Sequence, residues 1–182
     1  MGRCILVTGG SRSGKSIVAQ RLAQSLAGPR AFVATCPAID DEMRERIRKH
    51  QQARRRSDWL TVEEPLDLAA AIERASDHPV VLVDCLTLWV NNLMHEAGLR
   101  GREVSESQIA RHCKEAIGAC RRHSGTIIFV TNEVGMGIVP EDKLTRRFRD
   151  LAGRANQTIA AACDEVILAV CGQALTIKPQ TQ

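Results

Sequence analysis

Short apolar runs alternate with longer amphipathic stretches along most of this chain. The runs within Arg3–Thr8, Val80–Asp84 and Thr126–Thr131 are nearly continuous, which is typical of strands buried on both faces of a parallel sheet. The stretches between such runs repeat apolar residues at helical spacing. The predicted strands are residues 3–8, 31–35, 59–62, 80–84, 126–131, 164–170 and 174–178. The predicted helices are residues 14–27, 41–55, 66–74, 86–96, 105–122 and 141–163.

A glycine-rich turn joins the first strand to the first helix. Gly9 and Gly14, followed by Lys15 and Ser16, satisfy the spacing G-x-x-x-x-G-K-[ST] of a phosphate-binding loop. Backbone N–H groups of such a turn point into one concave site, and the helix dipole favours an anion there. Lys15 is expected to reach the β and γ phosphates of a nucleotide, and Ser16 to offer its hydroxyl to Mg²⁺. Asp84, at the carboxyl end of a predicted strand, is expected to orient the same ion or its waters.

The alternation of strands and helices around this loop predicts an α/β fold. We expect a P-loop NTPase-like (RecA-like) architecture, in which helices flank a mostly parallel central sheet that ends in a C-terminal β-hairpin across Cys171–Gln173. The length suits one domain, so residues 1–182 are expected to form a single P-loop α/β domain. Ala97–Gly101 is expected to be a loop between two helices. Asn132–Pro140, which contains two glycines, leaves a strand at the ligand edge of an open α/β sheet.

Composition and charge narrow the class of protein. Hydrophobic residues make up 44% of the chain, which argues against disorder, and the net charge of +4 is too small to indicate nucleic acid. Basic residues nevertheless gather between Arg44 and Arg56, which fits either a solvated helix face or an anionic ligand. The aromatic content of 3% weakens any base-stacking mode of binding. The cysteines form no CxxC pair, the chain opens on a strand, and no apolar run approaches the ~18 residues of a membrane span, so we expect a reduced, cytoplasmic compartment.

The predicted helix 41–55 carries the second group of candidate residues. Arg46, His50 and Arg54 recur at four-residue spacing and form a stripe along it. The two arginines disfavour the imidazolium form of His50, and a neutral imidazole is a nucleophile. The same arginines are suited to grip phosphate oxygens. The spacing alone also fits an ordinary half-exposed histidine among surface arginines.

Several motifs taken together resemble one family. They are Thr8–Ser16; Asp40–Met43; Arg46 and Ile47 with His50; Trp59, Thr61 and Glu63; Val130–Pro140; and Phe148–Asp150 with Gly153, Asn156 and Gln157. On these residues the chain, from Ile5 to Lys178, resembles the bifunctional adenosylcobinamide kinase / adenosylcobinamide-phosphate guanylyltransferases of cobalamin biosynthesis. The resemblance implies two reactions. The first phosphorylates the hydroxyl of the aminopropanol arm of adenosylcobinamide with ATP or GTP, and the second transfers GMP from GTP to the new phosphate and releases pyrophosphate.

The resemblance also implies roles for particular residues. GMP would pass through a guanylylated His50, with Lys15 stabilising the departing pyrophosphate. Glu63 would accept from guanine N1–H and N2–H, a pairing that adenine cannot offer. The implied nucleotide contacts are Gly9, Gly10, Ser11, Arg12, Ser13, Gly14, Lys15, Ser16, Ala34, Thr35, Cys36, Gln51, Gln52, Ala53, Arg54, Glu63 and Asp84. The implied ligands are ATP, GTP, Mg²⁺ at Ser16 and Asp84, and adenosylcobinamide with its phosphate. Family members associate as homo-oligomers, and a trimer is the expected size here. We expect no nucleic-acid partner and no membrane span.

Other interpretations of the same residues stay open at this point. The segment between His50 and Trp59 is one residue longer than the family pattern, so Arg54 and Arg55 both fit the single family arginine. A monofunctional P-loop small-molecule kinase would need the loop but not His50. An NTP-gated nucleic-acid binder would use the basic stretch Arg44–Arg56, and the low net charge counts against it.

Two features near the C-terminus have no assigned chemistry. We expect the loop around Gly135 and Gly137, with a helical stripe that includes Arg149 and Asn156, to shape the corrinoid site or a subunit contact. Gly153 lies inside the predicted helix 141–163, where glycine costs about 1 kcal/mol relative to alanine. Close packing or a ligand is therefore expected to compensate there.

Overall fold

The structure is a computed structural model that describes residues 2–37 and 59–179. The strands are β1 (Arg3–Gly9), β2 (Arg30–Ala34), β3 (Trp59–Glu63), β4 (Val80–Asp84), β5 (Thr126–Val130), β6 (Glu165–Val170) and β7 (Gln173–Lys178). The helices are α1 (Lys15–Ser25), α3 (Leu68–Arg74), α4 (Leu86–Leu99), α5 (Glu106–Arg122) and α6 (Lys143–Ala162), with a 3₁₀ turn η1 (Val134–Met136). The predicted helix 41–55 lies outside the described residues.

These strands form one sheet in the order β3-β2-β4-β5-β1-β6-β7. Every neighbouring pair is parallel except β6 and β7, which form an antiparallel hairpin. The structure therefore confirms the predicted α/β class, the mostly parallel sheet and the C-terminal hairpin.

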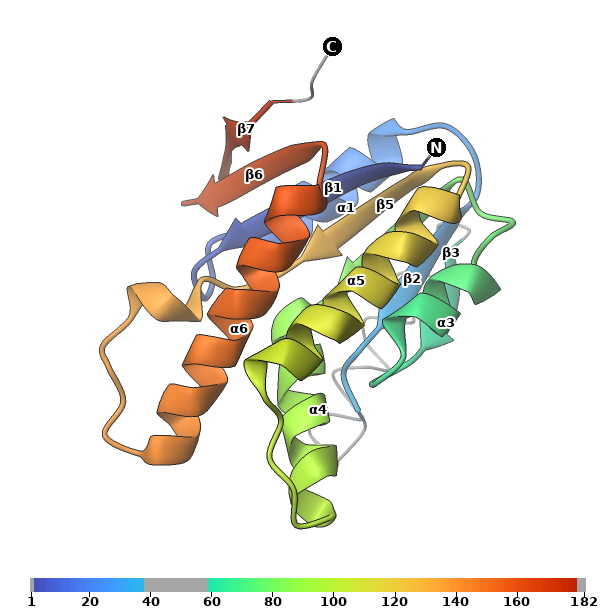
Figure 1. Ribbon diagram of the computed structural model, residues 1–182. Coiled ribbons are helices and arrows are strands. Elements are labelled where there is room, and N and C mark those ends of the chain that lie inside the picture. The colour runs from blue at the N-terminus through green and yellow to red at the C-terminus, as the bar shows by residue number, and fades with distance from the viewer. Residues whose placement is uncertain (1, 38–58, 180–182) are drawn as a thin grey trace.

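Alternate residues of the central strands contribute to two separate hydrophobic cores. On one face of the sheet, Leu6 and Phe129 pack with buried residues of α3, α4, α5 and α6. On the other face, Ile5 and Val7 pack with Ala19 and its neighbours on α1. Figure 1 shows the same arrangement, with α1 behind the sheet and the other labelled helices in front of it. Because both faces are covered, the central strands are apolar at consecutive positions, which is the pattern seen in the sequence.

Side-chain caps fix the starts of the two longest helices. At α5, Ser105 and Gln108 form a reciprocal capping box, with bonds of 3.2 and 2.7 Å between side chain and backbone. Such a cap stabilises a helix start by about 1 kcal/mol. At α6, the Asp142 carboxylate accepts from the hydroxyl and the N–H of Thr145. Those two bonds, the hydroxyl first, hold the pKa of Asp142 below its ordinary value.

The loop predicted over Ala97–Gly101 is wrong in its first half, because α4 continues to Leu99. The helix was expected to end at Glu96, before a loop that contains Gly98. A glycine in an exposed last turn costs only about 1 kcal/mol relative to alanine. Arg100 pairs with Glu96 one turn back at 2.5 Å, and such an exposed pair returns about 0.3–0.5 kcal/mol. The local penalty is therefore small enough for the helix to run through the glycine.

Candidate functional site

The candidate nucleotide residues converge on the carboxyl edge of the sheet. Strand register aligns Glu63 with Ala34, Ala34 with Asp84, Asp84 with Val130, and Val130 with Val7. The row ends at Val7, which is followed by Thr8 and the glycine-rich loop. Neighbouring strands lie about 4.8 Å apart, so the row from β3 to β1 spans roughly 19 Å. Residues from five strands thus share one edge, which the sequence predicted only in outline.

The glycine-rich loop has no room for side chains at its two motif glycines, Gly9 and Gly14. A Cβ on Gly9 would lie 2.5 Å from the Ala169 carbonyl oxygen on β6. Gly14 has φ 91° at the start of α1, and a Cβ there would lie 2.8 Å from Gly172 Cα. The turn between β6 and β7 also holds the loop directly, because the Gly172 N–H donates to the Ser13 carbonyl at 2.8 Å. The loop is thus fixed against the hairpin.

The loop presents the Lys15 ammonium and the free N–H groups of a helix start. Lys15 is half-buried, and its Nζ donates to the Gly10 carbonyl oxygen at 3.1 Å, so the ammonium lies across the loop. Ser16 follows at the second position of α1 and is half-buried. The first backbone N–H groups of any helix lack intrahelical partners, and here they open toward the glycines. This combination forms a site for an anion.

Thr35 has a structural role at the strand end rather than an exposed position. Its side chain is fully buried, donates to the Cys85 carbonyl at 2.8 Å and accepts from the Cys85 N–H at 2.8 Å. The Asn92 side chain donates to the Thr35 carbonyl at 2.7 Å. Burial and, after it, the charge of Asp84 raise the pKa of the Cys85 thiol to about 11, although the backbone N–H groups of Leu88 and Thr87 and the charge of Lys15 lower it. The charges of Asp84 and Lys15 therefore both influence the Cys85 thiol, and they do so in opposite directions.

A buried polar network connects the loop strand to β5 and α6. Thr8 donates through its hydroxyl to Glu133 Oε1 at 2.7 Å, and the Asn156 amide donates to the same oxygen at 3.2 Å. Thr131 donates to Asn156 Oδ1 at 2.7 Å, which fixes the orientation of that amide. The Thr87 hydroxyl lies 3.2 Å from that of Thr131. Sequence reasoning assigned Glu133 no role, because its partners are far apart in the chain.

The remaining predicted contacts divide between those that the structure describes and those that it does not. Glu63 is exposed at the end of β3, Ala34 is at the margin of the core, and Cys36 is half-buried just beyond β2. The proposed nucleophile His50 and the segment Gln51–Arg54, which the resemblance implied as contacts, lie outside the described residues.

The loop after β5 is largely apolar and exposed. Met136 is 76% exposed and Ile138 94% exposed. Arg149 on α6 donates to the Gly135 carbonyl at 2.6 Å and so ties the loop to the helix. Asn156, expected on the same functional stripe, is instead buried in the polar network described above. A Cβ on Gly153 would meet open space, so close packing does not explain that glycine.

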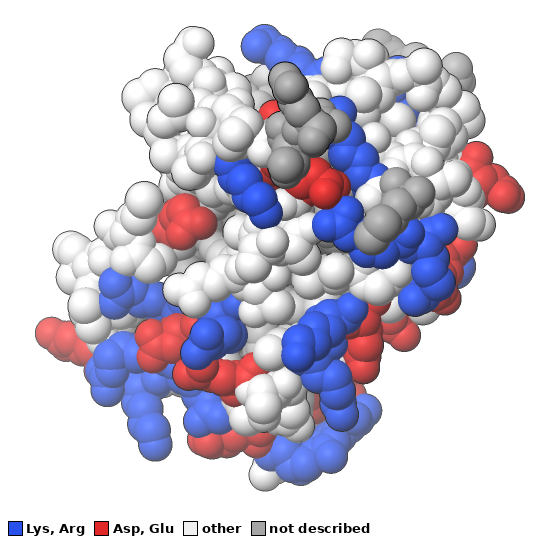
Figure 2. All heavy atoms as spheres, turned by 45° about the horizontal axis from the view of Figure 1, so that its top comes forward, with Lys and Arg blue, Asp and Glu red and all other residues white. Residues whose placement is uncertain are grey.

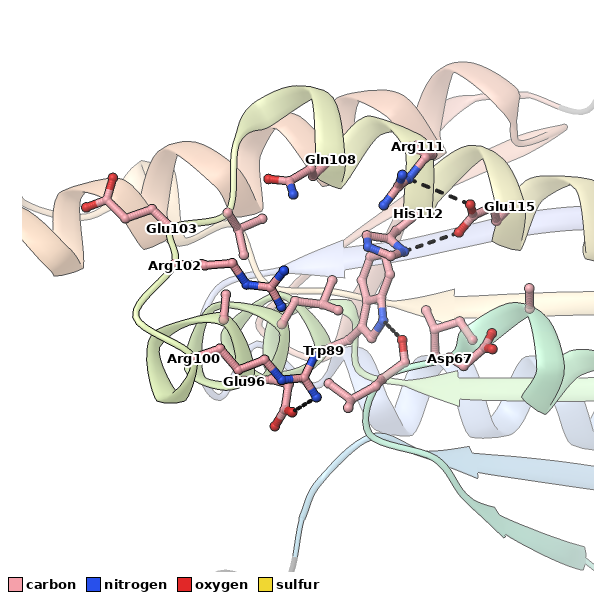
Figure 3. Close-up of a pocket in the computed structure, with 16 residues that line it drawn as sticks. Asp67, Trp89, Glu96, Arg100, Arg102, Glu103, Gln108, Arg111, His112 and Glu115 are labelled. Carbon is pink, nitrogen blue, oxygen red and sulfur yellow. Dashed lines mark hydrogen bonds and ion pairs between the residues drawn. The ribbon is translucent and has the colours of Figure 1, made fainter.

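Apart from the carboxyl edge of the sheet, a pocket of about 670 Å³ lies between α4 and α5 (Figure 3). Its floor is Trp89, whose indole N–H donates to the Leu66 carbonyl at 2.7 Å. The His112 ring packs edge-on against that indole and lies 3.2 Å from a Glu115 oxygen. Arg111 pairs with Glu115 at 3.8 Å. Trp89 is buried and belongs to the hydrophobic core, and the charges of this pocket are partly paired with each other.

Charges of both signs are interspersed on the face shown in Figure 2. Ion pairs of the described residues include Arg154 with Glu106 at 2.7 Å and Arg3 with Glu165 at 2.7 Å. The described residues on that face therefore do not form the single-sign patch typical of nucleic-acid binders. Over residues 2–37 and 59–179, no helix is long and apolar enough to cross a membrane. The same residues contain no group of three or more His, Cys, Asp or Glu side chains arranged for a metal ion.

Comparisons of the sequence with a family model and with known proteins agree on one family. Residues 5–177 match the family described as cobinamide kinase / cobinamide phosphate guanyltransferase. The chain is 43% identical over 184 residues to the bifunctional adenosylcobalamin biosynthesis protein CobU of Escherichia coli (strain K12), covering 96% of this chain and 99% of that protein. It is 41% identical over 175 residues to the bifunctional adenosylcobalamin biosynthesis protein CobP of Pseudomonas aeruginosa, covering 95% and 96%.

A solved structure gives the fold. The KaiC-like protein of Pyrococcus horikoshii OT3 superposes with a TM-score of 0.54 at 13% identity, over 92% of this chain and 70% of that one. This likeness confirms the predicted P-loop, RecA-like architecture and, at that identity, shows the fold alone.

Proposed function

This chain belongs to the cobinamide kinase / cobinamide phosphate guanyltransferase family, whose members are bifunctional kinases and nucleotidyltransferases, and we propose that one nucleotide site at the carboxyl edge of its sheet serves both reactions. The observation that carries this proposal is the register row, which brings Glu63 and Asp84 to the same edge as the phosphate loop. Near full-length relatives named as bifunctional proteins disfavour a monofunctional kinase.

In the kinase step, the loop and the start of α1 would hold the triphosphate of ATP or GTP. Lys15, which already lies across the loop, would move from the Gly10 carbonyl to the β and γ phosphates. Ser16 and Asp84 supply a hydroxyl and a carboxylate, the oxygen donors that Mg²⁺ prefers, so these residues fit the ion. When bound, Mg²⁺ would neutralise charge that develops on the phosphates.

In the guanylyl step, we propose that His50 is the nucleophile. Its neutral imidazole nitrogen would form a bond to the α-phosphorus of GTP as the bond to the pyrophosphate oxygen breaks. Lys15 and the loop amides would stabilise the departing pyrophosphate. The phosphate of the cobinamide product would then displace the imidazole, which gives adenosylcobinamide-GDP and regenerates His50.

Glu63 is proposed as the residue that selects guanine for this step. A carboxylate can accept from both guanine N1–H and N2–H. Adenine cannot offer this pair of donors, so it would leave the carboxylate unpaired and the site would discriminate strongly against it. Its exposed place at the end of β3, four strands from β1, sets it well away from the phosphate loop. An extended nucleotide would be needed to reach both.

Three wider properties complete the proposal. Adenosylcobinamide and its phosphate are the acceptors, in agreement with the family description. We propose that the chain is a single domain, works in the cytoplasm and associates as a homo-oligomer, with a trimer as the size to test first. The apolar loop that Arg149 ties to α6 is proposed to border the corrinoid or a subunit contact.

Separating the two reactions tests the proposal. His50→Ala should abolish GMP transfer to adenosylcobinamide phosphate and leave phosphorylation of adenosylcobinamide intact, because only transfer needs the nucleophile. Lys15→Ala should impair both, because the phosphate loop serves both. A His50→Ala variant that transfers GMP at the wild-type rate would refute the assignment.

A further inference from the structure

We propose that the carboxylate of Glu133 is the general base of the kinase step, which takes the proton from the acceptor hydroxyl as the γ-phosphoryl group is transferred. Glu133 lies three residues beyond the end of β5 and immediately before η1 of the apolar loop. The inference rests on the proposed function, since it names the proton acceptor for the kinase half of that site. Nothing in the sequence motif of the phosphate loop identifies such a residue.

The position of Glu133 relative to the loop is the first support. Its backbone N–H donates to the Gly9 carbonyl at 3.1 Å, and the Lys15 ammonium donates to the adjacent Gly10 carbonyl at 3.1 Å. Glu133 and the cation expected at the β and γ phosphates therefore contact consecutive residues of the same turn. This places the base beside the end of the nucleotide that is transferred.

The hydrogen bonds around the carboxylate are the second support. Thr8 and Asn156 both donate to Oε1, whereas Oε2 receives no hydrogen bond from the described residues. The Thr131 hydroxyl donates to the side-chain oxygen Oδ1 of Asn156. The NH₂ group of the same side-chain amide is therefore turned toward the Glu133 carboxylate. The group is half-buried and held at one oxygen, which leaves the second oxygen available to an acceptor hydroxyl. A base held by packing and hydrogen bonds is positioned at little entropic cost.

The proposed step balances as follows. The hydroxyl oxygen forms a bond to the γ-phosphorus while the bond from that phosphorus to the β–γ bridging oxygen breaks, and the nucleoside diphosphate leaves. The hydroxyl proton passes to Glu133 Oε2 and is then lost to water. In a loose transition state this transfer occurs late, so the base prevents the charge from accumulating on the acceptor oxygen. General bases of this kind contribute about 10²–10⁴-fold to the rate.

Glu133→Gln is the decisive variant because its amide oxygen can still accept from Thr8 and Asn156. The anchoring of the loop is then preserved and only proton acceptance is lost. Thr8→Val is the matched control, because it removes one anchoring bond and keeps the carboxylate. Three quantities are measured: kcat for phosphorylation of cobinamide with ATP, kcat for GMP transfer to cobinamide phosphate supplied directly, and Kd for a non-hydrolysable ATP analogue.

The expected result for Glu133→Gln is a fall in kinase kcat of about 100-fold or more, with transfer kcat and the analogue Kd within about threefold of wild type. Thr8→Val should weaken kinase and transfer to similar extents. The proposal is overturned if Glu133→Gln lowers both reactions equally, which would make the residue a positioning group for the loop, or if its kinase kcat falls less than about 100-fold.

Two further measurements keep the test decisive. If Glu133→Gln does not fold, Glu133→Asp shortens the side chain by one methylene, and the kinase must again fall more than transfer, whereas equal falls contradict the proposal. Failure of the proposed function looks different, because the wild-type chain would then lack one of the two reactions before any substitution at Glu133.

Discussion

Replacing Thr35 with valine tests whether the site depends on a buried bond between strand ends. Valine keeps the shape of the side chain and removes its hydroxyl. Thr35 is fully buried, and its hydroxyl makes two 2.8 Å bonds, one to each backbone group of Cys85. The variant therefore leaves the buried Cys85 N–H without a partner, whereas the Cys85 carbonyl still accepts from the Trp89 N–H at 3.1 Å. One unsatisfied buried group gives a predicted loss of about 1–3 kcal/mol in the free energy of unfolding.

Urea unfolding followed by circular dichroism measures this loss against a matched control. Thr158→Val removes an exposed hydroxyl that bonds the Arg154 carbonyl within α6 at 2.8 Å, and it should change stability by less than about 0.5 kcal/mol. Thr35→Val should also lower kinase kcat, since Cys85 follows Asp84 directly. If Thr35→Val is as stable as Thr158→Val, the bonds do not hold the strand ends together and the reasoning fails.

Three other substitutions test separate parts of the structure. Gly153→Ala should raise the free energy of unfolding by about 0.5–1 kcal/mol, because its Cβ meets open space; an accompanying rise in KM for cobinamide would indicate that the corrinoid approaches there. Arg149→Ala frees the Gly135 carbonyl and should raise KM for cobinamide or weaken self-association, while the Kd for ATP stays unchanged; no effect on either would remove this role. At Glu64, burial opposes ionisation, but two backbone amides and Arg74 hold the pKa below its ordinary value. The stabilisation by this carboxylate, about 1 kcal/mol, is present above its unfolded pKa of about 4.3 and lost as the pH falls through the lower folded pKa. Glu64→Gln should therefore be less stable than wild type at pH 7, and the difference should shrink as the pH falls through the folded pKa of Glu64.

The parts that the sequence predicted well are those with local signals. The phosphate loop depends on spacing within eight residues, and its two glycines are required by contacts with Ala169 and Gly172 that any side chain would violate. The strands were predictable because a sheet covered on both faces needs apolar residues at consecutive positions. The end of α4 was missed because the cost of Gly98 is small and the Glu96–Arg100 pair opposes it.

The parts that the sequence did not predict depend on partners far apart in the chain. Thr8 and Glu133 are 125 positions apart, and only the pairing of β1 with β5 brings them together. Thr35 was expected to contact nucleotide, and its burial against Cys85 gives its side chain a structural role that propensity cannot reveal. Asn156 was placed on a functional stripe by spacing, but the same helix face is turned toward β5.

The central claim is that one site passes GMP through a protein histidine, and labelling tests it most directly. The chain is incubated with GTP labelled in the α-phosphate, denatured and divided between acid and alkali. We predict label on the protein that is lost in acid and stable in alkali, as expected for a phosphoramidate, and that is absent from His50→Ala. Full GMP transfer without protein-bound label, or label that survives in His50→Ala, would contradict the claim.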